Sequence, residues 1–131
     1  MKKEMKNIKT GYGTMTHTDG TKYEGKIVDG LPQFFGTFTQ TDGTKYVGEI
    51  LDGLPFGKGT RTTPEGIKYV GIFVNGLYHG KGIITFPNGD KVEGYFRKGR
   101  HDGDLTVTPI EGETFVEDGT KFQNIGLEGT E

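Results

Sequence analysis

Glycine recurs along this chain with a period of 23 residues. Counting each repeat from Tyr23, Tyr46, Tyr69, Val92 and Phe115, glycine fills positions 3, 8, 12, 14 and 21 in almost every copy. These five columns contain 21 of the 24 glycines in the 131 residues. A fixed period of this length is the signature of a repeat architecture, in which each unit packs on its neighbours. The glycines are therefore structural and do not mark a flexible linker.

The columns between the glycines alternate as in half-buried β-strands. Position 17 is threonine in every copy, and position 15 is threonine in all copies except one, which has Ile83. Position 16, between them, is apolar except at Arg61, for which the sequence offers no reason. A period of two places the threonines on one face of a strand and the apolar side chains on the other. In the second strand, glycine at position 3 leaves room for an aromatic ring to lie over the backbone.

Turn signals separate these strands. Asp-Gly at residues 19–20 and 42–43 and Asn-Gly at 88–89 predict two-residue hairpin turns. At the other end of each hairpin we expect longer loops, over residues 29–35, 52–58, 75–81 and 98–103. Strands are then expected over 13–18, 22–28, 35–41, 45–51, 59–63, 67–74, 82–86, 90–97, 104–108 and 113–117. The predicted fold is all-β: an elongated, single-layer antiparallel meander of 23-residue hairpins with about ten strands.

Composition excludes several classes of protein. The chain has no cysteine, serine, alanine or tryptophan, so a serine or cysteine nucleophile, a disulfide and a thiolate metal site are excluded. No run approaches the roughly 18 apolar residues that span a bilayer, and residues 1–10 lack the apolar segment of a signal peptide. We therefore expect a cytoplasmic location or a place within a larger assembly. Three arginines give little support to nucleic-acid binding.

The charge is unevenly distributed along the chain. Residues 1–101 contain 15 Lys/Arg and 10 Asp/Glu, whereas residues 102–131 contain one lysine and eight acids. A solvated basic tail and an acidic end explain this distribution. The alternatives are end-to-end attraction between copies and a basic face for an acidic partner.

The repeat resembles a known family. Tyr69-Val70-Gly71, the run from Asn75 to Gly82, and Phe86-Pro87-Asn88-Gly89 are similar to the MORN repeat (membrane occupation and recognition nexus). The resemblance covers residues 11–114, with Phe34 in place of a glycine and Val92 in place of the tyrosine. It implies a β-hairpin array that acts as a scaffold, a dimerisation module or an appended domain, without catalysis or a cofactor. Membrane or phospholipid binding gave the family its name and is not general to it.

We divide the chain into three parts on this basis. Residues 1–10 form a basic tail, and residues 115–131 form a degenerate acidic cap. The array lies between them, as a half repeat at 11–22 and full repeats at 23–45, 46–68, 69–91 and 92–114.

Three sets of residues are candidate binding surfaces. Apolar residues at positions 9–11 are explained either by stiffening and packing of the loops themselves or by an exposed ridge on the loops that docks a protein partner or another copy: Leu31, Pro32, Leu54, Pro55, Phe56, Leu77 and Tyr78. Tyr46, Tyr69 and Phe73 are explained by cross-strand packing or by an exposed binding face. The lysines at position 23 form a stripe that is either a solvated face or a contact for anionic lipid or an acidic protein: Lys22, Lys45, Lys68 and Lys91.

Metal binding and catalysis are the least favoured interpretations. His79, His101, Asp102 and Asp104 lie on adjacent loops, but a metal site requires three or four converging ligands. Acid pairs drawn from Asp29, Glu49 and Asp52 suit glycoside hydrolysis, yet Asp29 and Asp52 occupy a turn column of the repeat. The sequence therefore predicts a protein-interaction or structural module, with anionic-lipid binding as the alternative, no metal and no cofactor.

Overall fold

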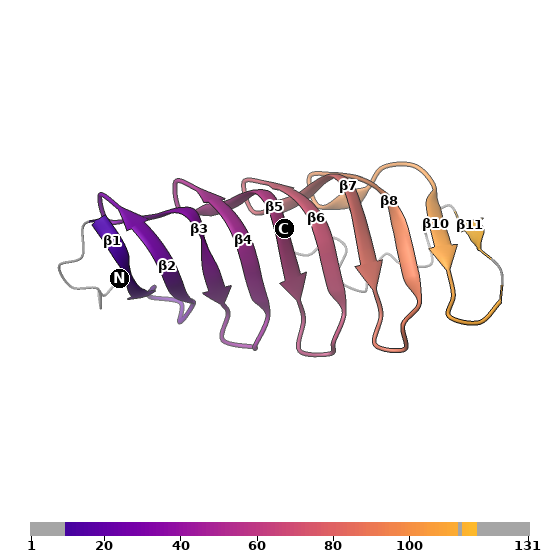
Figure 1. The fold of residues 1–131 in the computed structure, drawn as a ribbon, viewed down its shortest axis with the longest axis horizontal. Helices are drawn as coiled ribbons and strands as arrows, with labels where there is room; N and C mark the ends of the chain where they lie inside the picture. Colours follow the sequence, from indigo (N-terminus) through magenta and orange to yellow (C-terminus); the bar gives the residue numbers. More distant parts are fainter. Residues whose placement is uncertain (1–9, 113, 118–131) are drawn as a thin grey trace.

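The computed structural model describes residues 10–112 and 114–117, which form one antiparallel sheet (Figure 1). Its order is β1-β2-β3-β4-β5-β6-β7-β8-β10-β11, with the short β9 paired to β8. The strands are β1 Thr10–Thr16, β2 Lys22–Val28, β3 Leu31–Thr39, β4 Lys45–Leu51, β5 Leu54–Thr62, β6 Lys68–Val74, β7 Leu77–Thr85, β8 Lys91–Arg97, β9 Arg100–His101, β10 Leu105–Thr108 and β11 Phe115–Glu117. The predicted single-layer meander is confirmed. Most of the predicted tail and cap lie outside the described residues.

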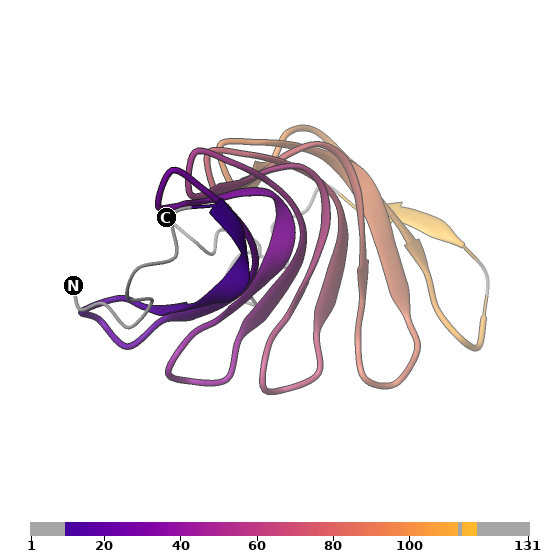
Figure 2. The same ribbon diagram turned by 60° about the vertical axis from the view of Figure 1, so that its left-hand side comes forward.

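The sheet bends across its strands, so that each hairpin forms an arc (Figure 2). In the pair β4–β5, Gly48 lies opposite Gly59 and Ile50 lies opposite Pro55, so three residues of β5 face the single residue Glu49 of β4. An excess of residues on one strand is a bulge, which bends the strand and increases its twist. Because the other hairpins have register shifts at the same place, the bend repeats along the array.

The repeated tyrosine packs on the pair of opposed glycines in its own hairpin, as Tyr69 packs on Gly71 and Gly82 of the β6–β7 pair. A Cβ on Gly82 would lie 2.5 Å from Cε2 of Tyr69, so only glycine leaves room for this ring. The Tyr69 hydroxyl donates a hydrogen bond to the Ile72 carbonyl over 2.9 Å, and Tyr23 and Tyr46 repeat this contact with the carbonyls three residues after them. The phenol is therefore buried and hydrogen-bonded at once, which explains tyrosine at this position.

The core is a layer of apolar side chains on the concave face of the sheet. Tyr69 and Tyr78 stack at its centre with their ring centroids 3.8 Å apart, and Phe73 and Phe96 contact them edge-on. The buried core consists of Met15, Tyr23, Ile27, Tyr46, Ile50, Tyr69, Phe73, Tyr78, Ile84, Val92, Phe96, Leu105 and Val107. The curved sheet thus covers one face with its own side chains.

The two ends of the hairpins are interchanged relative to the prediction. The two-residue turns are at 29–30, 52–53, 75–76 and 98–99, where both residues have positive φ. The predicted loops over 29–35, 52–58 and 75–81 are wrong, because β3, β5 and β7 begin directly after these turns. The predicted two-residue turns at 19–20, 42–43 and 88–89 are also wrong. Each pair lies inside a longer turn, in which the amide of His17, Gln40 or Phe86 donates to the carbonyl four residues later.

Hydrogen bonds and glycine contacts link successive repeats along both edges of the array. The amide of Gly53 donates to the Pro32 carbonyl over 2.9 Å, and Gly76 donates to Pro55 in the same way. At the opposite edge, Gly66 packs on Pro87, whose Cγ would lie 3.3 Å from an added Cβ. Each repeat is thus fixed to the next at both ends of its strands, as the stacking of marginal hairpins requires.

Candidate functional site

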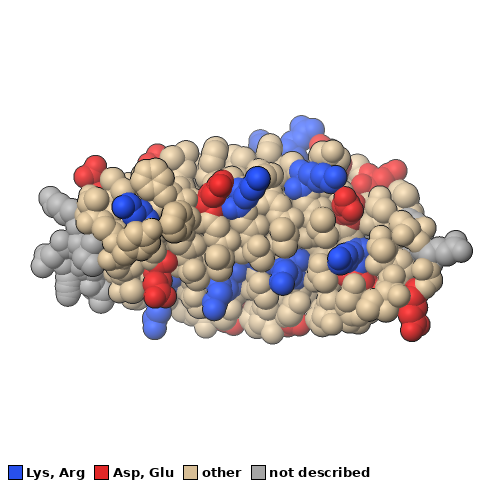
Figure 3. Space-filling view, viewed as in Figure 1, with Lys and Arg blue, Asp and Glu red and all other residues tan. Residues whose placement is uncertain are grey.

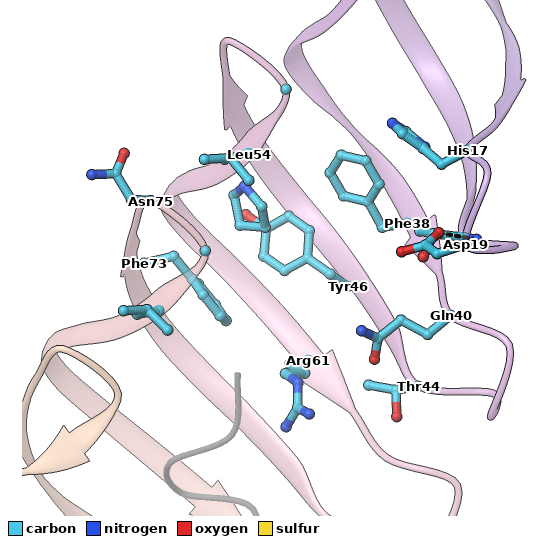
Figure 4. Close-up of a pocket in the computed structure, with 15 residues that line it drawn as sticks. His17, Asp19, Phe38, Gln40, Thr44, Tyr46, Leu54, Arg61, Phe73 and Asn75 are labelled. Carbon is cyan, nitrogen blue, oxygen red and sulfur yellow. Dashed lines mark hydrogen bonds between the residues drawn. The ribbon is translucent and has the colours of Figure 1, made fainter. Parts of the chain in front are cut away.

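A groove of about 330 Å³ runs over the middle of the concave face (Figure 4). Phe38, Tyr46 and Phe73 form its floor, from β3, β4 and β6. One wall is apolar and comes from the two-residue turns and the strand starts after them, including Leu54 and Leu77. The opposite wall is polar and comes from the longer turns and the adjoining strand ends: His17, Asp19, Gln40, Thr44 and Arg61. The groove therefore has an apolar side and a hydrogen-bonding side, facing each other across aromatic rings.

Arg61 is held in place within this groove. Its Nη1 donates a 2.8 Å hydrogen bond to the hydroxyl of Tyr78, and its guanidinium lies 5.9 Å from the centroid of that ring. Burial raises the pKa of the Tyr78 hydroxyl, and the nearby Arg61 partly offsets that rise. The interruption of the apolar column at Arg61 thus places a fixed cation beside the apolar floor.

Two further polar groups line the same wall. The Asp19 carboxylate accepts a hydrogen bond from the amide of Thr21 over 2.8 Å, and this bond lowers the pKa of Asp19. The Nδ1 of His17 is buried, and no hydrogen-bond partner for it is present within residues 10–112 and 114–117. The wall therefore presents one cation, one anion and an imidazole to a bound segment.

Each lysine of the stripe precedes a core residue on its strand, so the stripe lies on the opposite, convex face, where Figure 3 shows several basic side chains in a row. All four lysines are exposed, and they alternate with threonines in one row across the sheet, because Lys45 pairs with Thr39 and Thr62, and Lys68 pairs with Thr62 and Thr85. The ion pairs within the described ranges involve other residues, Lys81 with Glu93 and Arg97 with Asp102. The acids of those two ion pairs therefore do not neutralise the lysines of the row.

The predicted apolar ridge is only partly exposed. Leu31, Leu54 and Phe56 are exposed, whereas Pro55 and Leu77 are half-buried. Pro32 and Tyr78 are buried, so their predicted position on exposed loops is wrong. All seven residues lie in β3, β5 and β7, because the turns before them are short.

The tyrosine face is also not exposed. Tyr46, Tyr69 and Phe73 keep 5%, 1% and 1% of their surface accessible, so their role as a freely exposed face is wrong. They are core residues, and Tyr46 and Phe73 also form the floor of the groove. A partner in the groove would reach them only through their remaining accessible edges.

Exposed aromatic residues near the N-terminal end of the sheet were not predicted from the sequence. Tyr12, Phe34 and Phe35 are all more than half exposed, and the rings of Tyr12 and Phe35 lie 6.2 Å apart. Phe34 has φ of 68°, a conformation that is strained for a bulky side chain. The sequence signal for Phe34 is its repeat position, position 12, because the other copies have glycine there.

The candidate metal and acid residues take structural positions. Within the described ranges, no three His, Asp or Glu residues lie close enough together to hold an ion. Asp102 pairs with Arg97, and the Glu49 carboxylate accepts the amide of Lys58 across the bulge over 3.0 Å. Asp29 and Asp52 occupy the first position of two-residue turns, with φ of 50° and 49°.

The fold defines the chain as a β-hairpin repeat protein, in which 23-residue units add one hairpin each to a curved sheet. A family model, the MORN repeat, matches residues 5–22, 23–45, 46–68 and 69–91. The chain therefore belongs to the MORN-repeat family. No curated protein matches it. Repeats of this family mediate protein or membrane interactions, and the described residues contain no helix that could cross a membrane.

Proposed function

We propose that this chain is a non-catalytic protein-binding module whose concave groove holds an extended segment of a protein partner. The observation that carries the proposal is the groove itself, in which an apolar wall faces Arg61 and Asp19 across a floor of aromatic rings. Binding sites for other molecules are concave, mostly apolar and supplied with a few placed polar groups. A module of this kind would serve as a scaffold or as a small subunit of a larger assembly.

The dimensions of the groove favour a peptide segment over a whole protein surface. A volume of about 330 Å³ accommodates only one or two large side chains, and hydrogen bonds from the repeats already fix both walls. Because the walls are preorganised, little conformational entropy is lost on the receptor side. Burial of a leucine or phenylalanine stabilises by roughly 1.5–3 kcal/mol, so two such anchors are consistent with micromolar affinity.

Selection from a displayed random peptide library tests this proposal without a known partner. The peptides that the full chain enriches should bind with affinity about tenfold weaker, or worse, when Leu54 is replaced by arginine, because the new side chain occupies the apolar wall. Leu51→Arg is the matched control, since Leu51 is opposite Leu54 in the hairpin, is 48% against 46% exposed, and does not line the groove. Peptides that bind both variants equally, or no enrichment at all, would contradict the groove proposal.

The lysine row supports a second candidate function, binding to an anionic phospholipid surface. Four exposed lysines, one per repeat, lie in a row on the convex face, away from the groove. Attraction to an anionic surface is worth about 1 kcal/mol for each nearby lysine, so four act additively at low salt. Both functions are compatible, because they use opposite faces of the sheet.

Sedimentation with phosphatidylserine vesicles at low salt tests the second candidate. Replacement of Lys22, Lys45, Lys68 and Lys91 by glutamine should abolish binding. A control variant carries the same four replacements at Lys26, Lys58, Lys81 and Lys98, outside the row, and should keep most of the binding. Equal loss in the two variants would reject the row as the contact and leave only general charge attraction.

A further inference from the structure

We propose that copies of this chain join end to end, with β11 of one copy forming an antiparallel pair with β1 of the next. This contact lies outside the groove: it joins the two edge strands of the sheet, and its partner is a second copy.

Within the described residues, the sheet begins and ends in the middle of a repeat. Each repeat contributes a first strand, such as β2, and a second strand, such as β3, which are joined by a two-residue turn and paired with a bulge between them. The array starts with β1, which is a second strand by its repeat position, and ends with β11, which is a first strand. Within the described residues, β1 pairs only with β2 and β11 pairs only with β10. The two ends are therefore complementary halves of one repeat.

The register of the proposed contact follows from the pairs inside the array. Tyr23 faces Phe38 and Glu24 faces Thr37 in the β2–β3 pair. Phe115 and Val116 have the repeat positions of Tyr23 and Glu24, and Met15 and Thr14 have those of Phe38 and Thr37. The same register therefore places Phe115 opposite Met15 of the next copy and Val116 opposite Thr14 of the next copy. Val116 and Thr14 are both exposed, so the pair is accessible to a second molecule. Since β11 runs antiparallel to β1, the joined sheet continues with the same concave face.

The turns show the same complementarity. Inside the array, the glycine at position 21 contacts the residue at position 19 of the next repeat, as Gly43 contacts Pro64 and Gly89 contacts Ile110. At the end of the array, a Cβ on Gly112 would meet, among the described residues, only its own turn neighbour Pro109 at 3.8 Å. Thr18 of the next copy is the position-19 residue that would cover it.

In the sequence, opposite charges flank the two edge strands. Residues 1–10 contain four lysines and one glutamate, whereas residues 111–118 contain four acids and no base. The strand β1 itself, TGYGTMT, carries no charge and no proline, the usual means by which an edge strand prevents pairing with another chain. Attraction between unlike ends favours head-to-tail contact over contact between two identical ends. A head-to-tail contact without closure builds an open chain of copies.

Cysteine cross-linking tests the register. Residues directly opposite in an antiparallel pair have Cα atoms about 4.5–5.5 Å apart, within the roughly 4.4–6.8 Å that a disulfide spans. Because the natural chain has no cysteine, Thr14→Cys and Val116→Cys provide unique thiols. We expect the two single variants, mixed under mild oxidation, to give a mixed disulfide dimer. The double variant should give a ladder of dimers, trimers and larger species.

The matched control for this experiment is Val70→Cys. Val70 has the same repeat position as Val116 and is also exposed, but it lies inside the array, on β6. Mixing Val70→Cys with Thr14→Cys should give little mixed dimer. Equal cross-linking of both pairs, efficient dimerisation of Thr14→Cys alone, or no cross-linking at all would overturn the head-to-tail arrangement.

Charge reversal provides a second, independent test in solution. One variant carries glutamate in place of Lys2, Lys3, Lys6 and Lys9, and the other carries lysine in place of Glu111, Glu113, Glu117 and Asp118. At low salt, sedimentation velocity should show association of the natural chain, loss of association in each variant alone, and recovery in an equimolar mixture. Association that is unchanged in both variants, or not recovered in the mixture, would overturn the proposal. Circular dichroism checks that both variants keep the fold.

Discussion

Arg61 on β5 and Tyr78 on β7 are joined by a 2.8 Å hydrogen bond from the guanidinium Nη1 to the phenol oxygen. The two residues are 17 positions apart and come from adjacent repeats. Each departs from its column, since position 16 is otherwise apolar and position 10 is proline in the two preceding repeats. The departures therefore occur as a pair, and together they place a charge in the groove without leaving it unpartnered.

A double-mutant cycle on this pair should show coupling. Tyr78→Phe and Arg61→Met each remove one partner, and the double variant removes both. Because a hydrogen bond to a charged group is worth about 1.5–3 kcal/mol when buried and Arg61 is only half-buried, we expect a coupling energy of about 1 kcal/mol in the free energy of unfolding. Tyr95→Phe, at an exposed tyrosine, is the control and should change stability little. Additive single effects would show that the bond is not stabilising.

Gly71 and Gly94 occupy the same repeat position but face different neighbours. A Cβ on Gly71 would lie 2.7 Å from the Lys81 carbonyl oxygen and 2.8 Å from Cα of Gly82, both backbone atoms. A Cβ on Gly94 would lie 2.5 Å from Cδ2 of Leu105, the end of a side chain that can move. Overpacking lowers the free energy of unfolding by about 1–3 kcal/mol. In urea unfolding, the loss for Gly71→Ala should be near the upper end of this range, and the loss for Gly94→Ala should be clearly smaller. Equal costs would refute the backbone-clearance argument.

Stability should fall at alkaline pH. Burial raises the pKa of Tyr23 to about 12 from its ordinary value of 10.0, and burial also raises the pKa of Tyr46, Tyr69 and Tyr78. A raised pKa means that the folded state favours the neutral phenol. Its contribution to stability is complete below pH 10 and is lost as the pH rises from 10 through 12.

Urea midpoints measured across this range should therefore stay level below pH 10 and then fall. Tyr23→Phe should fall less steeply, since one of the titrating phenols is gone. Tyrosinate absorbance that develops fully near pH 10 while the chain is still folded would contradict the argument.

Phe34 offers a gain of stability by substitution. Its φ of 68° is unfavourable for a bulky residue, and 61% of its side chain is exposed, so burial offsets little of the strain. Phe34→Gly should therefore stabilise the chain by about 1 kcal/mol, read from the urea midpoint. Phe35→Gly, at the neighbouring exposed aromatic without positive φ, is the control and should not stabilise. A loss of stability in Phe34→Gly would mean that the ring packs more closely than its exposure indicates.

The sequence by itself determined the repeat, the strand type and the family. The period of 23 fixes how the units stack, and alternation with period two fixes which residues share a face, because side chains of a strand point alternately to its two sides. Both are local properties of the chain. The glycine columns likewise predicted that rings would lie over the backbone, as Tyr69 lies over Gly82.

Only the tertiary structure decided the turns, the burial of the ridge and the position of the groove. Asp-Gly or Asn-Gly pairs occur at both ends of the hairpins, so these pairs alone do not predict which end has the tight turn. The strand register decides this: residues 52–53 form a tight turn, and residues 19–20 lie in a longer one. Tyr78 became a core residue because the bulges bend the sheet around its concave face. The curvature of the sheet results from small register shifts that add up over many strands. Contacts such as that of Arg61 with Tyr78 form between two repeats. The pattern within one repeat predicts neither of them.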